Sequence, residues 1–296
     1  MAMSRAQPAS LKPSLQRRRS TRVQRVPKLP TLIVLLSVVT ALLAPVLAPH
    51  SAINPNLLDR RKPPVFLEHG SMKYALGTDW QGRDILSRII IGTRISLAVA
   101  FVSILVGGLV GTLLGILAGY CGGWIDMVIM RAVDVMLAFP SILIALVFAV
   151  TVGPSFWVVV TVLALLIWAR YARLVRAEVL VWEQRDFVAL ARIAGCSATG
   201  IIWRHLLPNI ANSVIVLSTL QVGWAIVVEA SLGFLGAGIP PPTPTWGGMV
   251  ADGRNYVDTL WWIAVFPGIA IMLVVLAFNL FGDWLRDVLD PKLRQL

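Results

Sequence analysis

The chain has 296 residues, of which 57% are hydrophobic and 14% are charged, and its formal net charge is +11 at pH 7. A soluble domain has too little interior for this much apolar sequence, and the apolar residues gather in blocks about as long as the ~20 residues that cross a bilayer. The composition therefore excludes a soluble protein and predicts an all-α polytopic membrane protein, because the strands of a transmembrane barrel would alternate apolar and polar residues.

The positive charge lies where it would set membrane topology. Of the 26 lysines and arginines, 8 precede Pro30, and most of the others flank apolar blocks. Basic residues beside spans stay in the cytoplasm and orient the chain, so we expect a lipid membrane around it and no nucleic-acid partner. Residues 1–28 are expected to form a basic, disordered cytoplasmic tail.

The first expected span is Leu32–Leu47, and residues 29–93 form a unit of this span and an outside segment. A basic start before a short apolar core also fits a signal peptide, which sequencing of the mature N-terminus would distinguish. Within the outside segment, DILSRII predicts a short amphipathic helix along the membrane surface. Around it stand four charged residues that either form a site or make a charged face that is solvated or mutually paired: Asp79, Arg83, Asp84 and Arg88.

The second span, Ile95–Tyr120, is rich in glycine. Four of its glycines are spaced four residues apart and form a ridge on one helical face: Gly107, Gly111, Gly115 and Gly119. Such ridges let helix backbones approach closely inside lipid. A third span is expected over Val133–Val152, with Arg131 and Asp134 near the membrane boundary, where they would pair or snorkel.

The remaining spans complete the topology. A fourth, Phe156–Trp168, leads into a loop with six arginines against three acidic residues. The fifth and sixth, Ile210–Phe234 and 261–280, are separated by Pro240–Trp246, a proline-rich loop expected to be exposed. With six spans and both termini in the cytoplasm, 18 lysines and arginines lie inside and 8 outside, as the positive-inside bias requires. Residues 94–296 would thus hold a core of five helices.

The cytoplasmic loop Arg185–Asn209 has the pattern of folded structure. Four apolar residues at helical spacing predict one face of a short helix: Phe187, Leu190, Ala191 and Ala194. Asp186 would cap the start of this helix, and Gly195 would end it in a left-handed conformation. Ser197 can cap a second short helix, and Pro208 marks the start of the next span. We therefore expect a helix-turn-helix outside the bilayer that binds a partner.

Motifs of nucleotide, metal and hydrolytic sites are absent from the sequence. None of the five lysines follows a glycine, so no GxxxxGK[ST] loop exists. The three histidines are scattered, and the two cysteines, Cys121 and Cys196, fall near cytoplasmic loops without metal-ligand spacing. We expect no catalytic residues, no metal and no cofactor. Transport is then the leading function, with an ion-coupled secondary transporter or a membrane scaffold as alternatives.

The loop Arg185–Asn209 resembles the cytoplasmic coupling loop of ATP-binding-cassette importer permeases. That signature is Glu-Ala-Ala, three residues, Gly, nine residues, Ile, one residue and Leu-Pro. It is kept at Ala191, Gly195, Leu207 and Pro208. It is not kept at Ala189, Leu190 and His205. The missing glutamate shifts the expected docking towards shape and towards the flanking Asp186 and Arg192.

Four further stretches are similar to the second permease subunit of dipeptide/oligopeptide importers, a branch that includes nickel and glutathione systems. They follow in the family's order: LGTDWQGRDILSRIIIGTRISL, GGWIDMVIMRAVDVMLAFPSILIAL, EASLGFLGAGIPPPTPTWGGM and FNLFGDWLRDVLDP. The resemblance covers Leu76–Pro291. It implies the type I importer permease fold with six transmembrane helices in a bacterial inner membrane.

The resemblance also implies partners and site residues. The partners would be a sister permease, two ATPase subunits (or one fused) that bind the ATP, and an extracytoplasmic solute-binding protein. The solute would be a di- or oligopeptide, with nickel chelates, glutathione or another small solute as the alternative. Coupling to the ATPases would involve Asp186, Phe187, Ala189, Leu190, Ala191, Arg192, Gly195, His205, Leu207 and Pro208. Glu229, near the outer end of the fifth span, is a candidate outer gate.

Overall fold

The computed structural model describes residues 26–289, so the tail expected over residues 1–28 lies almost wholly outside the described part. Its longer helices are α1 (Lys28–Leu47), α2 (Ile85–Cys121), α3 (Gly123–Ala138), α4 (Ser141–Val152), α5 (Phe156–Glu183), α6 (Asp186–Ile193), α8 (Leu207–Phe234), α9 (Trp246–Gly253) and α10 (Trp262–Leu289). The short elements are η1 (Leu57–Asp59), α7 (Ala198–Ile201), the π-helical turn η2 (Ile202–Leu206) and η3 (Arg254–Tyr256). The predicted all-α architecture is confirmed.

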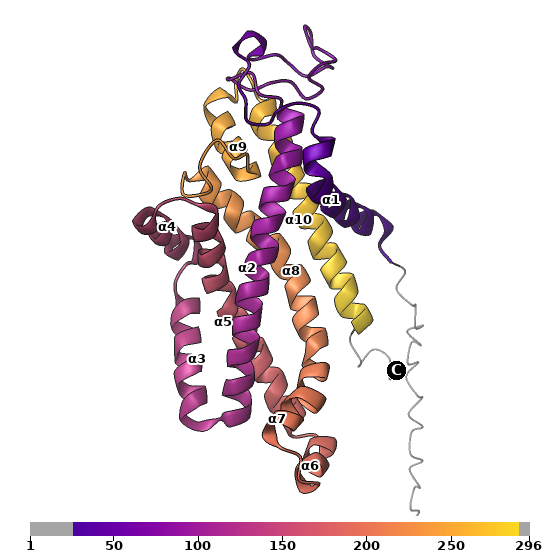
Figure 1. The fold of residues 1–296 in the computed structure, drawn as a ribbon, viewed down its shortest axis with the longest axis vertical. Helices are drawn as coiled ribbons and strands as arrows, with labels where there is room; N and C mark the ends of the chain where they lie inside the picture. Colours follow the sequence, from indigo (N-terminus) through magenta and orange to yellow (C-terminus); the bar gives the residue numbers. More distant parts are fainter. Residues whose placement is uncertain (1–25, 290–296) are drawn as a thin grey trace, which may run out of the picture.

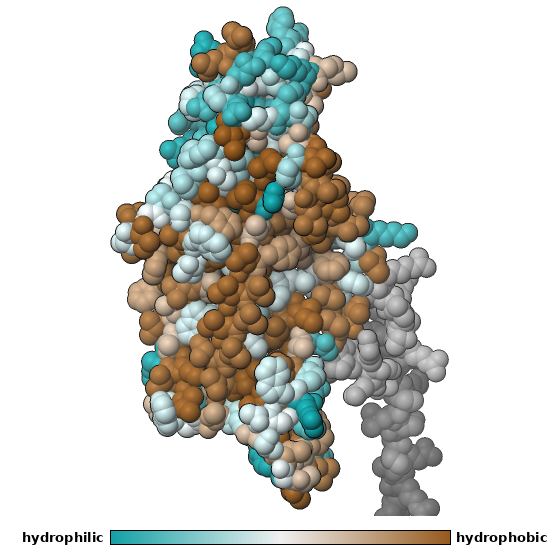
Figure 2. Space-filling view, in the orientation of Figure 1, coloured by the Kyte–Doolittle hydropathy of each residue, from teal (hydrophilic) through white to brown (hydrophobic). Residues whose placement is uncertain are grey.

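The helices run between two opposite ends of the molecule (Figure 1). The α9 end holds α9, the start of α2 and residues 48–84, and the α6 end holds α6 and α7. Helices α2 and α5 run from the α9 end towards the α6 end. Helices α3 and α8 run in the opposite direction, and α10 follows α9. Figure 2 shows hydrophobic residues along the middle and hydrophilic ones gathered at the α9 end, as expected of a chain that crosses a bilayer.

The third predicted span is not one helix. Five stretches of the described chain are apolar and long enough to cross a membrane, and α3 with α4 would make a sixth only as a pair bent by 89°. The bend lies at Phe139 and Pro140, where the ring of the proline keeps the preceding residue out of helical geometry, and Phe139 has ψ 144°. The helix also begins ten residues before the predicted Val133, at Gly123.

Helix α2 begins earlier than predicted. Asp84 caps it by accepting a hydrogen bond from the Ser87 backbone N–H at 3.1 Å, and the helix then continues unbroken to Cys121. The stretch DILSRII therefore forms the first turns of α2, and the separate surface helix predicted there is wrong. Its apolar residues face other elements of the chain, because Ile85 is fully buried against α9 and α10.

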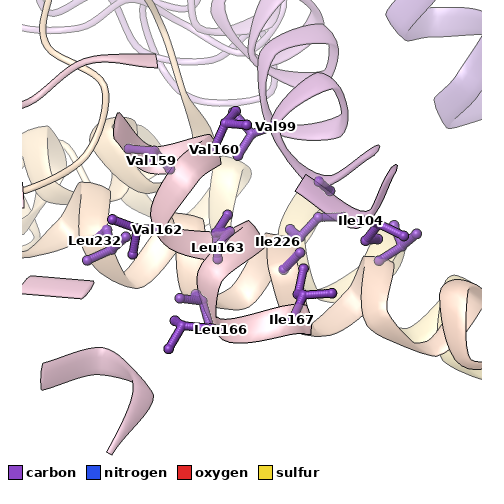
Figure 3. Close-up of a cluster of buried hydrophobic side chains, with 14 of the residues drawn as sticks. Val99, Ile104, Val159, Val160, Val162, Leu163, Leu166, Ile167, Ile226 and Leu232 are labelled. Atoms are coloured by element: carbon purple, nitrogen blue, oxygen red, sulfur yellow. The ribbon is translucent and has the colours of Figure 1, made fainter. Parts of the chain in front are cut away.

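The glycine ridge of α2 packs against α5, as predicted. A Cβ built on Gly111 would lie 2.3 Å from the carbonyl oxygen of Trp168, and the other three ridge glycines would meet α5 atoms at 2.6–2.7 Å. Only hydrogen in place of a side chain permits this distance between the two backbones. Figure 3 shows the aliphatic core beside the ridge, formed by α2, α5 and α8: Val99, Ile104, Leu163, Ile167, Ile226 and Leu232.

The proline-rich loop between α8 and α9 is only partly exposed. Pro240, Pro241 and Pro242 are exposed, whereas Trp246 retains 1% of its accessible surface and begins α9. The indole Nε1 of Trp246 donates to the carbonyl oxygen of Ile89 at 3.2 Å, so the ring locks α9 onto α2. The prediction of an exposed loop through Trp246 is therefore wrong at its C-terminal end.

Candidate functional site

Helix α6 is short and defined at both ends. It begins at Asp186, while the cap position is Arg185, whose side chain makes no capping bond. Asp186 is thus in the first turn, where its charge favours the helix dipole, and the predicted cap is wrong by one residue. Gly195 follows the helix with φ +80°, the left-handed conformation predicted for it. Ser197 accepts from the Gly200 N–H at 3.2 Å and caps α7, also as predicted.

The buried face of α6 differs from the face predicted by spacing. Val188 is fully buried in a cluster with residues of α5 and α8, and Ala191 is 9% exposed. Leu190 and Ile193 are 64% and 83% exposed, and Phe187 is 38% exposed. We call these three residues the α6 stripe: Phe187, Leu190 and Ile193. Ile193 was missed in the sequence, although it continues the i, i+3 spacing of the other two.

The other loop residues connect α6 to α8 through an exposed turn over residues 194–197 and a continuous helix from Ala198 onwards. The rings of Phe187 and His205 lie 6.0 Å apart, and Leu206 is fully buried. Helix α7, the π-helical turn and α8 follow one another without a break, so Leu207 and Pro208 lie in the first turn of α8. Ala189 and Arg192 are exposed, and Arg192 donates to the Glu183 carboxylate at 2.7 Å. The predicted second short helix is thus an extension of the span itself.

Charged residues near the predicted outside segment pair with one another. Asp79 is fully buried, and one of its carboxylate oxygens, Oδ2, accepts from Arg83 Nε and from Arg88 Nη1, each at 2.6 Å. Asp252 of α9 contacts the same two guanidinium groups at 3.4 and 3.1 Å. Asp84 caps α2 and lies 3.3 Å from His50. Of the two interpretations, mutual pairing is confirmed, and the pairs are buried.

Two ion pairs fasten α3 to α5 closer to the α6 end. Arg173 donates to Asp134 at 2.6 Å, and Arg176 donates to both carboxylate oxygens of Asp126. The predicted pairing of Arg131 with Asp134 is therefore wrong, because the partner comes from α5. Within residues 26–289, no three His, Cys, Asp or Glu side chains stand close enough to hold a metal ion.

Glu229 is enclosed near the end of α8 that adjoins α9. The residue is fully buried, and its Oε2 accepts from the Ser96 hydroxyl of α2 at 3.0 Å. Its second carboxylate oxygen has no hydrogen-bond partner within the described residues. The side chain thus bridges α2 and α8 inside the chain, and its role as an outer gate stays a prediction.

Known proteins resemble this chain over most of its length. The family model described as "Binding-protein-dependent transport system inner membrane component" matches residues 111–295. The chain is 48% identical to the dipeptide transport system permease protein DppC of Escherichia coli strain K12 over 233 residues, which are 79% of this chain and 78% of that protein. It is 43% identical over 263 residues to the di/tripeptide transport system permease protein DppC of Pseudomonas aeruginosa strain UCBPP-PA14, covering 89% and 87%. It is 42% identical over 277 residues to the glutathione transport system permease protein GsiD of Escherichia coli O6:K15:H31, covering 93% and 89%.

Proposed function

Because the chain belongs to the family of binding-protein-dependent transport system inner membrane components, we propose that it forms half of the pathway of an ATP-driven importer for di- and oligopeptides. It is a multi-pass protein of a bacterial inner membrane. The sister permease would supply the other half, two ATPase subunits (or one fused) would bind the ATP, and an extracytoplasmic protein would deliver the solute. This chain would be a non-catalytic subunit, with the α6 end in the cytoplasm.

The observation that carries this proposal is the α6 stripe. Exposed apolar side chains on a helix outside the bilayer have no lipid to cover them, and such patches commonly mark a protein interface. A helix of eight residues fits a groove on a partner, where shape and apolar contact supply the affinity. Since α6 packs on α5 and is tied through His205 to α8, a force on the stripe would reach both spans. Closure of the ATPase pair would then move the bundle, and access to the solute would alternate between the two faces.

Substitution of Leu190 or Ile193 by aspartate is expected to uncouple the ATPase subunits from this chain. A carboxylate in the apolar interface would lose its hydration without a partner, so solute-stimulated ATP hydrolysis and uptake should each fall at least tenfold. Both should be measured with the complete complex in lipid vesicles.

The matched control for this test is Leu58→Asp, which changes a leucine that is more exposed than either tested residue and lies at the opposite end of the molecule. It should leave both activities near those of the unchanged complex. If Leu190→Asp and Ile193→Asp complexes assemble and keep full uptake and stimulation, the stripe is not the coupling surface.

The identity of the solute is a separate question, since glutathione, a nickel chelate or another small solute would use the same machinery. The solute that stimulates ATP hydrolysis by the purified complex would identify it. Uptake that persists without ATP but follows an ion gradient would instead indicate a secondary transporter.

Glu229→Gln tests the outer gate. Glutamine keeps the shape of the side chain and can accept from the Ser96 hydroxyl, so the melting temperature of the complex should stay the same or rise. If the acid group itself gates the pathway, uptake should fall several-fold. Glu68→Gln, on an exposed residue of the same type, serves as the control. Full uptake by the Glu229→Gln complex would remove this residue from the gate.

A further inference from the structure

Arg170 lies near the middle of α5, two residues beyond the predicted end of the fourth span at Trp168. Its sequence neighbours Trp168 and Tyr171 pack against Gly111 of α2. Gly111 in turn lies nine residues, or about 14 Å, from Tyr120 at the end of the apolar stretch of α2. The Arg170 side chain reaches Gln221, the midpoint of the 28-residue helix α8. A charge within a membrane span costs free energy, and in membrane proteins such a charge commonly faces a partner or a water-filled path.

Arg170 differs from its neighbours on α5 in having no carboxylate partner. Arg173 and Arg176 each pair with an aspartate of α3. Arg170 instead donates from Nη1 to Gln221 Oε1 at 3.1 Å, and its guanidinium lies 4.1 Å from the centre of the Trp224 ring. Among residues 26–289 it forms no ion pair. The positive charge is therefore held in place but not neutralised.

The cluster offers hydrogen-bond donors and lacks acceptors. A guanidinium carries five N–H donors, and only one of those of Arg170 is used by the described residues. The Gln221 amide nitrogen is buried and has no hydrogen-bond partner among the described residues, while the amide oxygen of Gln221 already accepts from Arg170. Two groups of donors thus stand side by side, one charged and one neutral. A carboxylate, with two acceptor oxygens and one negative charge, complements them in number and in sign.

An open apolar groove lies farther along α8, towards the α9 end. Val227, Ser231 and Phe234 follow Trp224 at steps of three, four and three residues, so they lie on the same helical face. They line a cavity of about 430 Å³, together with residues of α4, α9 and α10. That volume falls within the range of small-molecule sites, and its walls are almost wholly apolar.

We propose that Arg170 and Gln221 form a carboxylate-binding site for the transported solute, with Trp224 holding the guanidinium in place. The inference rests on the proposed import function and adds a specificity-determining residue to it. Dipeptides, tripeptides and glutathione, the solutes named for the relatives, differ in size but share a free carboxylate. A fixed cation in the middle of α5 would recognise this common group, and the apolar groove farther along α8 would accept varied side chains.

The test compares a peptide with its own amide. Uptake of L-alanyl-L-alanine and of its C-terminal amide is measured with the complete complex in vesicles, at saturating concentrations of each. Arg170→Gln should reduce the maximal uptake of the free acid at least tenfold and that of the amide less than twofold. Arg170→Lys should recover part of the loss, because it restores the charge but not the forked geometry. Arg94→Gln, which removes an exposed arginine of α2, should leave the ratio of the two uptake rates unchanged.

Other outcomes overturn the proposal in recognisable ways. Equal losses of acid and amide, with a complex that assembles poorly, would show that the carboxylate facing Arg170 belongs to the sister permease. Unchanged uptake of both would show that the cluster contacts no solute. A wild-type complex that imports no tested solute would instead refute the proposed function, and this inference with it. If the wild-type complex imports the peptide and the Arg170 variants keep its ratio of acid uptake to amide uptake, this inference alone is refuted.

Discussion

Substitution of Gly111 by leucine is expected to prevent α2 from packing against α5 and to leave little folded protein in the membrane. Even a methyl group at this position would lie 2.3 Å from the Trp168 carbonyl oxygen and 2.6 Å from the Tyr171 Cβ. Backbone atoms of a neighbouring helix cannot yield as a flexible side chain does. Overpacking a core typically costs about 1–3 kcal/mol, and we expect Gly111→Ala to lie at the top of that range and Gly111→Leu beyond it.

The measurement is the yield of monodisperse protein in detergent, with its melting temperature where any folds. Gly268→Leu is the matched control, since a Cβ on this glycine of α10 would meet no atom within 4 Å. It should fold normally. A Gly111→Leu protein that melts at the same temperature as the control would mean that α2 and α5 do not contact each other along the ridge.

Replacing Asp79 by asparagine should destabilise the α9 end by about 3–5 kcal/mol, the usual penalty for removing one partner of a buried ion pair. Asp79 accepts from both buried guanidinium groups and from the backbone N–H groups of Gln81 and Arg83. Without its charge, Arg83 and Arg88 would face each other with only Asp252, which is partly exposed and farther away.

Hydrogen exchange of residues 56–84 and the melting temperature should both report this loss, because the start of α2 and the segment before it meet at Asp79. Asp258→Asn makes the same change of charge on an exposed residue and should have no effect. Adding Arg88→Gln to Asp79→Asn should recover part of the stability, since one uncompensated cation is then removed. Normal exchange in the Asp79→Asn protein would show that the network is not needed for this end of the molecule.

Much of the fold could be predicted because lipid imposes strong rules on sequence. Spans show as apolar blocks, and the glycine ridge shows as a spacing of four that has few explanations other than close helix packing. The bend at Pro140 was not predicted, although the proline is visible, because apolar content runs through it unbroken. Helix α9 was missed for a similar reason: its tryptophan, Trp246, follows four prolines that do signal an exposed loop.

The candidate site shows where pattern alone is insufficient. Capping and turn chemistry are local, so Gly195 and Ser197 were placed correctly. The face of α6 is decided by what α5 and α8 present to it, and spacing cannot show that Val188 is the residue they cover. The partner of Asp134 was predicted wrongly for the same reason, since Asp134 pairs with Arg173, which lies 39 positions away in the sequence. Arg170 did not stand out, because only the fold shows that no carboxylate of the described residues pairs with it.

The π-helical turn at Ile202–Leu206 sets the rotation of α7 about the helix axis relative to α8. A π-turn holds one residue more than an α-turn, and each residue of an α-helix advances the direction of its side chain by about 100°. The side chains of α7 therefore point about 100° away from the directions that an unbroken α-helix would give them relative to Gln221 and Trp224 of α8. A chain shortened by one residue in this turn would rotate α7 by about a quarter-turn relative to α8, and it would disturb the contact of His205 with Phe187 and the burial of Leu206.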